Sequence, residues 1–148
     1  MRILCVCLGN ICRSPMAEGV IRALADRHGL ALEVDSAGTG AWHVGSPPTP
    51  EGVAAARARG YRTRDQRARQ VRPEDFHDFD LILAMDNANL ATLTRLRPPN
   101  ARAELRLFHP EGRDIPDPYG GGRAEYARTL ELVEEAARAL LPTLRGSA

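Results

Sequence analysis

The sequence predicts an α/β protein, a three-layer doubly wound sheet of about four parallel strands with helices on both faces. Short apolar runs alternate along the chain with segments of helical periodicity, which is typical of a parallel sheet. The first apolar run leads straight into a glycine-containing loop and a helix start, the place where such sheets bind ligands. A length of 148 residues suits one domain with a full core, so we expect a single domain over residues 1–148.

The first strand is predicted from the apolar run Arg2–Val6, and a helix is predicted over residues 15–28. Gly29 is a typical residue at a helix end. Rough alternation over Leu30–Ala37 indicates the second strand. The first helix has one apolar face, formed by Met16, Val20, Ile21 and Leu24.

A loop rich in glycine and proline, Gly38–Pro48, follows. Thr49 then predicts an N-cap, and the short helix that it begins ends at Gly60. The polar, arginine-rich segment Tyr61–Val71 is expected to be irregular. A second short helix is predicted to start at Arg72–Asp75.

The buried strand Asp80–Met85 is followed by Asp86, which we expect to cap a helix over Asn87–Leu96. A short last strand is predicted over Leu105–Phe108. The segment from His109 to Gly122 is expected to be a loop, because proline and glycine recur throughout it.

The longest helix is predicted over Arg123–Leu141, and Pro142 is expected to end it. Its apolar face comprises Tyr126, Leu130, Val133, Ala137 and Leu140.

The loop after the first strand carries the pattern C-x5-R-S, from Cys7 to Ser14. Convergent backbone N–H groups and the helix N-terminus would form an anion site there. Gly9 allows the backbone to approach an anion closely. Ser14 is expected to N-cap the helix and Pro15 to occupy its first position.

These residue types suit nucleophilic catalysis. The field of a helix N-terminus favours the thiolate of Cys7, and the planar fork of Arg13 can hold two phosphate oxygens. The Ser14 hydroxyl can donate to the sulfur. Sulfur would attack a bound tetrahedral oxyanion and form a phosphocysteine intermediate. The alternative is a structural cysteine and a surface arginine in an ordinary strand-to-helix turn.

The stretch CLGNICRSPM, Cys7 to Met16, closely resembles the active-site loop of the low-molecular-weight protein tyrosine phosphatases, and its place near the N-terminus fits them. The resemblance runs from residue 2 to about residue 138. It implies that residues 1–148 form one phosphatase domain, with the phosphate-binding loop after the first strand. Asn10 would hold the unusual backbone of this loop. The other loop residues expected to bind substrate are Leu8, Gly9, Ile11 and Cys12.

Cleavage of an aryl phosphate needs a proton donor for the leaving oxygen. Asp117 lies between two prolines on a stiff loop, and its sequence Asp-Pro-Tyr resembles the general-acid motif of the family. It would protonate the leaving group and then activate water. A turn-forming aspartate is the alternative reading, and Asp114 is the rival acid.

Two aromatic residues are candidates for the walls of a substrate slot. The resemblance places Trp42, the only tryptophan, along the cleft, and Tyr119 would form the other wall. The family often has a second tyrosine where this chain has Gly120. The family also commonly has a histidine where this chain has Gln66. A glutamine cannot carry the positive charge that a histidine can.

Cys12 lies in the same loop as Cys7, so a reversible disulfide between them is sterically plausible, and the resemblance suggests it too. This disulfide would shield Cys7 from over-oxidation. The alternative is that Cys12 is only a small apolar side chain that fills space in the core. Cys5 is expected in the core. The cysteines lack the spacing of metal ligands, so no metal or other cofactor is expected.

Composition narrows the function further. The net charge is only +1, so no bulk field favours nucleic acid. No apolar run is long enough to span a membrane, and no leader pattern precedes the first strand. A cytoplasmic location is expected. None of the four histidines carries a motif, so surface or capping roles are expected for them.

Three enzymatic interpretations remain, and we favour the first, because the apolar Ile11 suits a flat aromatic leaving group. The first is hydrolysis of phosphotyrosine in proteins, with a cognate tyrosine kinase as a plausible partner and inorganic phosphate as product. The second is a protein arginine phosphatase. Its loop typically has threonine where this chain has Ile11, although the pair Gly120-Gly121 is similar to that branch. The third is an arsenate reductase, which needs cysteines late in the chain, and none follows Cys12.

A phosphopeptide-binding module without turnover would lack one of the reacting residues. Cys7, Arg13 and Asp117 are all present, which favours an enzyme. Nucleotide binding through a glycine-rich loop with lysine is excluded, because the chain has no lysine.

Overall fold

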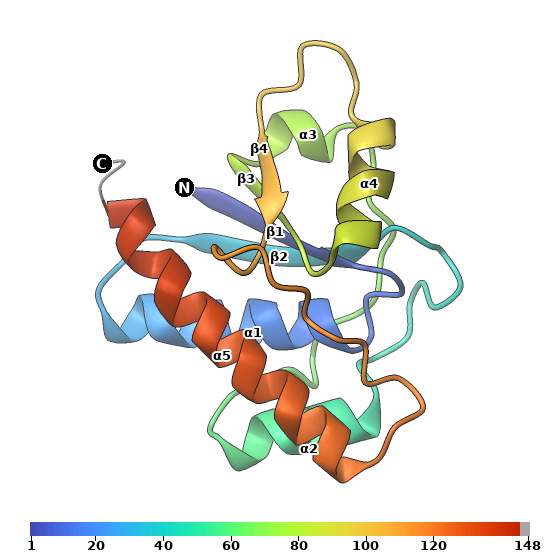
Figure 1. Cartoon of the computed structure of the whole chain (residues 1–148), viewed down its shortest axis with the longest axis vertical. Helices are drawn as coiled ribbons and strands as arrows, with labels where there is room; N and C mark the ends of the chain where they lie inside the picture. The colour runs from blue at the N-terminus through green and yellow to red at the C-terminus, as the bar shows by residue number, and fades with distance from the viewer. Residues whose placement is uncertain (146–148) are drawn as a thin grey trace.

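A computed structural model describes residues 1–145, and its centre is a four-stranded parallel sheet of order β2-β1-β3-β4 (Figure 1). β1 spans Arg2–Cys7, β2 Glu33–Gly38, β3 Leu81–Ala84 and β4 Glu104–Leu107. β1 pairs with both β2 and β3, so it lies in the middle of the sheet. The predicted parallel sheet is confirmed.

Helices cover both faces of the sheet, which confirms the three-layer prediction. α1, Arg13–Arg27, and α5, Arg123–Arg145, lie on one side, and α5 crosses α1 and reaches α2, Pro50–Ala58 (Figure 1). On the other side lie α3, Asp75–Asp78, and α4, Asn87–Leu96.

The alternation of side chains along each strand divides the core into two parts. Ile3, Cys5 and Leu83 lie in the cluster with α1 and α5. Leu4 and Val6 lie in the cluster with α3 and α4. All of these strand residues are fully buried, because β1 and β3 are covered on both faces.

Two of the three predicted helix caps, Thr49 and Asp86, are confirmed. The hydroxyl of Thr49 accepts a hydrogen bond from the amide of Gly52 at 3.3 Å. The carboxylate of Asp86 accepts one from the amide of Asn89 at 2.7 Å. Each cap satisfies a backbone donor that the first helical turn leaves free.

The predicted start of the first helix is wrong. α1 begins at Arg13 with Cys12 as its N-cap residue, and Cys12 makes no side-chain capping bond. Ser14 therefore lies inside the helix. Its hydroxyl contacts the Cys7 sulfur and the Asn10 side chain instead of capping a backbone N–H group. The second strand begins three residues later than predicted, because the amide of Leu30 donates to the carbonyl of Ala25 and closes the end of α1.

The last helix is longer than predicted, since α5 continues through Pro142 to Arg145. A proline so near the helix end removes only one backbone hydrogen bond. The buried side chains Leu140 and Leu141 keep this turn packed on the core. The last strand is shifted by one residue, because Glu104 pairs with Leu81.

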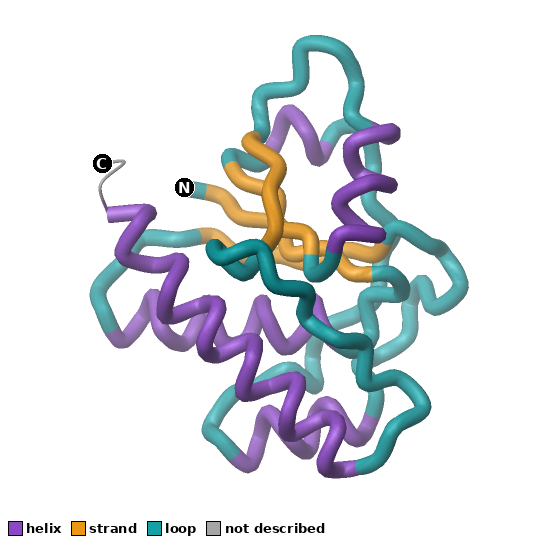
Figure 2. Tube along the Cα trace, in the orientation of Figure 1, coloured by secondary structure: helices purple, strands orange, loops and turns teal. Residues whose placement is uncertain are grey.

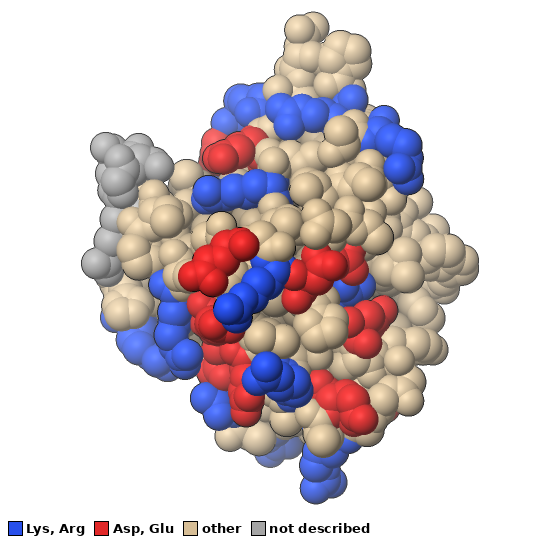
Figure 3. All heavy atoms as spheres, viewed as in Figure 1, with Lys and Arg blue, Asp and Glu red and all other residues tan. Residues whose placement is uncertain are grey.

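Acidic and basic side chains are mixed on the face drawn in Figure 3, as the small net charge predicts. Within residues 1–145, no helix is both long and apolar enough to cross a bilayer.

Candidate active site

The loops at the carboxyl ends of the strands form a cavity of about 140 Å³. The loop from β1 to α1, the loop after β2 and the loop after β4 all contribute to it, as Figure 2 allows the reader to follow. Its lining is Cys7, Leu8, Gly9, Ile11, Cys12, Arg13, Trp42, His43, Asp117 and Tyr119. Nearly every candidate residue from the sequence thus lines one cavity. Asn10 and Ser14 lie behind it.

Cys7 is the last residue of β1 and is 3% exposed. The backbone amide of Asn10 donates to its sulfur at 3.3 Å, and the hydroxyl of Ser14 lies 3.0 Å from the same atom. Both groups can donate to a thiolate, and hydrogen bonds to a charged form favour that form. The surroundings therefore suit a sulfur anion.

Asn10 shapes the loop. Its φ is 58°, a left-handed conformation that asparagine tolerates better than most residues. Its side-chain amide donates to Ser14 Oγ at 2.8 Å and to Ser36 Oγ at 3.0 Å. Its side-chain oxygen accepts from the amide of Arg69 at 3.0 Å. One buried side chain thus ties the loop to α1, to β2 and to the segment after Gln66.

Glu18 anchors the far end of this network. The hydroxyl of Ser36 donates to its carboxylate at 2.8 Å, and Arg22 pairs with it at 2.8 Å. Burial raises the pKa of Glu18, while the bond from Ser36 and the charge of Arg22 oppose that shift. The hydrogen bonds run from Glu18 through Ser36 and Asn10 to the hydroxyl beside Cys7.

Two glycines allow the loops to pack this closely. A Cβ on Gly38 would lie 2.8 Å from the carbonyl oxygen of Leu8, so a side chain there would displace the loop. A Cβ on Gly40 would lie 1.8 Å from the ring of Trp42, which therefore lies against the glycine backbone. The indole is supported by this contact although it is 73% exposed.

Arg13 is almost fully buried beside two carboxylates. Its guanidinium pairs with Asp86 at 2.5 Å and lies 3.6 Å from Asp117, and it donates to the carbonyl of Ile115 at 3.0 Å. Its Nε is buried and has no partner within residues 1–145. An unpaired donor next to the cavity is what a phosphate oxygen would satisfy.

Asp117 is half-exposed at the mouth of the cavity, and the amide of Tyr119 donates to it at 3.1 Å. The rival, Asp114, does not line the cavity. Its carboxylate accepts from the backbone and side-chain amides of Asn87, which fixes it at the start of α4. The position of the two carboxylates favours Asp117 as the acid.

Two residues of the site were not predicted from the sequence. His43 lines the cavity, with its ring centroid 6.1 Å from that of Tyr119. Its place beside Trp42 in the glycine-rich loop was the available signal. Asp86 was interpreted only as a cap, but its second oxygen pairs with Arg13. His109, for which a surface or capping role was expected, is 2% exposed, and its Nδ1 accepts a hydrogen bond from the amide of Glu111 at 3.2 Å.

Cys5, Cys7 and Cys12 are all free thiols in this structure. The sulfur of Cys12 lies 3.5 Å from the hydroxyl of Tyr126 and 4.0 Å from that of Thr49. Burial raises the pKa of Cys12 and raises that of Tyr126 to about 12. Cys12 is therefore less ready than an exposed thiol to ionise.

Gln66, the departure from the family histidine, donates from its side chain to the carbonyl of Pro15 at 3.0 Å. It thus holds the first turn of α1 without carrying charge. Within residues 1–145, no three acidic, histidine or cysteine side chains converge as a metal-ligand set.

A thiol held by donors in an anion loop, after the first strand of a doubly wound sheet, defines the class of cysteine-dependent phosphatases. The profile of the family described as "Low molecular weight phosphotyrosine protein phosphatase" matches residues 2–147. The chain therefore belongs to this family.

Individual relatives agree with this assignment. A putative low molecular weight protein-tyrosine-phosphatase of Synechocystis is 42% identical over an alignment of 152 positions, which covers 97% of this chain and 96% of the relative. The crystal structure of a protein tyrosine phosphatase from Entamoeba histolytica superposes with a TM-score of 0.93 at 34% identity and covers 99% of this chain and 98% of its own. A structure named as a Drosophila arginine phosphatase gives a TM-score of 0.92 at 33% identity and covers 97% and 98%.

Replacing Asn10 tests its role in the loop. Asn10→Gly loses the buried hydrogen bonds but tolerates the left-handed backbone, so we expect a loss of about 1–3 kcal/mol in the free energy of unfolding. Asn10→Ala loses the same bonds and adds strain of about 1–2 kcal/mol. Urea denaturation of both variants measures the difference. Equal stabilities would show that the left-handed backbone of Asn10 is not strained for alanine.

Proposed function

We propose that this protein hydrolyses phosphotyrosine in proteins through a phosphocysteine intermediate. The observation that carries the proposal is the cavity in which the Cys7 sulfur, the Arg13 guanidinium and the Asp117 carboxyl meet. The name of the Synechocystis relative supports the substrate. The substrate phosphate would lie on the loop from Leu8 to Cys12, whose amides and helix start favour an anion.

In the first step, the Cys7 thiolate attacks phosphorus in line with the leaving oxygen. The S–P bond forms while the bond from phosphorus to the phenolic oxygen breaks. Arg13 and the loop amides stabilise the equatorial oxygens, and the unpaired Nε of Arg13 gains a partner. Asp117 donates its proton to the departing phenolate.

In the second step, Asp117 takes a proton from a water molecule, whose oxygen attacks phosphorus. The S–P bond breaks, and inorganic phosphate and the Cys7 thiolate are released. Ser14 Oγ lies 3.0 Å from the sulfur. It stabilises the thiolate both as the nucleophile of the first step and as the leaving group of the second. Its hydroxyl is in turn held by the side-chain amide of Asn10.

The walls of the cavity favour a flat aromatic group. Ile11 is apolar and 8% exposed, and Trp42 and Tyr119 are exposed aromatic rings at the mouth. A phenyl ring gains contact area from such walls, whereas a guanidinium leaving group needs polar partners. The second candidate function is the hydrolysis of phosphoarginine in proteins, because the similar Drosophila structure is named as an arginine phosphatase.

Three subsidiary proposals follow from the same site. When a peroxide oxidises the Cys7 thiol to a sulfenic acid, the Cys12 thiol would displace water from it and form a disulfide, which shields Cys7 from over-oxidation and is reversed by a thiol reductant. The nucleophile must remain a free thiol, which a reducing cytoplasm maintains, so we place the protein there. A tyrosine kinase would supply its phosphorylated substrates.

A direct substrate comparison tests the proposed class. We expect the purified protein to hydrolyse a phosphotyrosine peptide with a kcat/KM at least about tenfold above that for a phosphoarginine peptide of the same sequence, since about 1.4 kcal/mol of preferential contact gives that ratio. Phosphate release from both peptides, followed over time, gives the two values. The reverse order would overturn the tyrosine assignment and leave the mechanism in place.

The second test removes the nucleophile. Cys7→Ser should lower kcat by about 10⁴-fold or more, because an alcohol at this site is a poor nucleophile. Phosphate binding, measured by calorimetry, should persist, since Arg13 and the loop amides remain. Turnover near that of the wild type would refute the role of Cys7.

The third test concerns the acid. Asp117→Asn should lower kcat by about 10²–10⁴-fold for phenyl phosphate, which has a poor leaving group, and far less for 4-nitrophenyl phosphate. Asp114→Asn is the matched control in the same loop and should leave both rates within about twofold. If Asp117→Asn slowed both substrates equally, Asp117 would not be the proton donor.

A further inference from the structure

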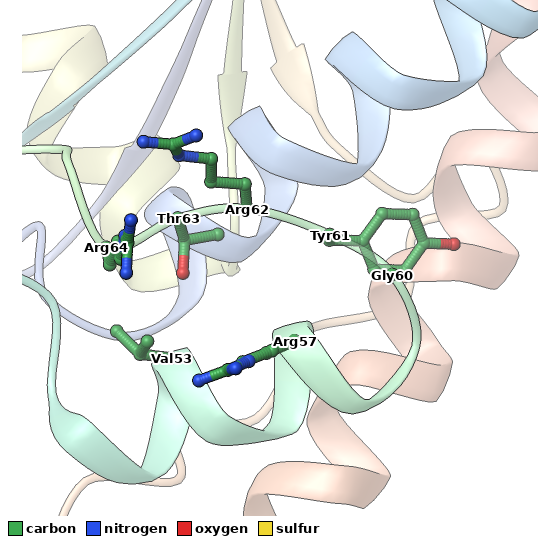
Figure 4. Close-up of a pocket in the computed structure, with 7 residues that line it drawn as sticks. All are labelled: Val53, Arg57, Gly60, Tyr61, Arg62, Thr63 and Arg64. Atoms are coloured by element: carbon green, nitrogen blue, oxygen red, sulfur yellow. The ribbon is translucent and has the colours of Figure 1, made fainter.

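A second hollow, of about 380 Å³, lies between α2 and the segment that follows it. Figure 4 shows its lining residues. They are Val53, Arg57, Gly60, Tyr61, Arg62, Thr63 and Arg64. None of them lines the cavity that holds Cys7, and the proposed hydrolysis uses none of them.

Thr63 has a buried hydroxyl without a partner. Its side chain is almost completely covered, with the residue 3% exposed, and Oγ1 makes no hydrogen bond within residues 1–145. Its methyl group faces α1, where a Cβ on Gly19 would lie 2.8 Å from it. The hydroxyl points the other way, toward α2 and the hollow (Figure 4). Buried polar atoms in proteins nearly always have a partner, so this donor points to a missing one.

The hollow carries net positive charge. Arg57 forms no ion pair or side-chain hydrogen bond within residues 1–145, and Arg64 lies 3.9 Å from its nearest carboxylate, Asp65. Figure 4 shows Arg57 lying along α2 with its guanidinium toward the space that the Thr63 hydroxyl faces. The lining residues include no carboxylate.

Arg62 is different from the other two arginines. Its Nε and Nη2 both pair with the carboxylate of Asp65, at 2.6 and 2.5 Å, and its side chain points away from α2 (Figure 4). Asp65 therefore neutralises Arg62, contacts Arg64 only at 3.9 Å, and leaves the charge of Arg57 unpaired within residues 1–145.

We propose that this hollow is a second anion site, which binds inorganic phosphate or a small phosphate monoester through Arg57, Arg64 and the hydroxyl of Thr63. Planar guanidinium forks and a hydroxyl donor match the oxygens of a tetrahedral dianion. Val53 provides an apolar wall for the organic part of a monoester. The volume lies within the range of about 300–1,000 Å³ that is typical of small-ligand pockets.

Amide NMR of the full-length protein tests the proposal, because it reports the two sites separately. Inorganic phosphate, titrated at constant ionic strength, should cause saturable shifts at residues 60–64 and an independent set at residues 8–13. Arg57→Gln and Thr63→Val should each weaken binding at residues 60–64 about tenfold, the effect of one good hydrogen bond to a charged group. Neither should alter the shifts at residues 8–13.

Arg95→Gln is the matched control, because Arg95 is an exposed arginine on α4, far from both sites in sequence. It should leave both sets of shifts unchanged. Phenylphosphonate, whose P–C bond resists hydrolysis, distinguishes the ligand sources. Tighter binding than inorganic phosphate at residues 60–64 assigns the hollow to monoesters, and weaker or equal binding assigns it to free phosphate.

Thr63→Val also separates ligand binding from folding. The hydroxyl has no partner in the protein, so its loss should leave the thermal stability without phosphate unchanged or higher. A marked fall in that stability would show that the hydroxyl serves the fold. Such a fall in stability would overturn the proposal. It would also be overturned by shifts at residues 60–64 that do not saturate, or by equal weakening of phosphate binding in Arg95→Gln.

Discussion

The left-handed turn at Asn10 is the constraint on which the site depends. At a φ of 58°, the backbone directs its own amide toward the Cys7 sulfur, while the side chain bonds to Ser14 and Ser36. Most residues would be strained there, and an apolar one would leave these partners unsatisfied. Gly38 lets the loop press against the end of β2. The thiol is therefore positioned by a local conformation that the surrounding sheet and helix hold fixed.

The buried charge of Arg13 explains how distant loops reach this site. A guanidinium removed from water needs carboxylate partners, and the chain supplies Asp86 after β3 and Asp117 after β4. Asp86 also caps α4, so one side chain fixes both a helix start and the arginine. The looser contact with Asp117, at 3.6 Å on a half-exposed loop, is compatible with the acid role proposed for that carboxyl.

Periodicity was sufficient to predict the fold, because strands buried on both faces and helices with one apolar face leave clear patterns. The exceptions are informative. Ser14 has the residue type of an N-cap, but the loop needs its hydroxyl at the sulfur, and α1 starts earlier. Pro142 does not end α5, because packing of Leu140 and Leu141 outweighs one lost hydrogen bond. The place of His43 in the cavity and the ion pair of Asp86 with Arg13 could not be predicted. Both depend on contacts between loops that are distant in the sequence.

The two ends of the cavity differ in how firmly they are held. On the phosphate side, Cys7 and Arg13 are buried and bonded to neighbouring groups. The mouth is formed by exposed rings on loops, among them Trp42 and Tyr119. Under the proposed hydrolysis, substitutions at the mouth would change the leaving group that fits without disturbing the chemistry at phosphorus. The proposal therefore assigns the selectivity of this chain to the aromatic rings at the mouth and to Ile11.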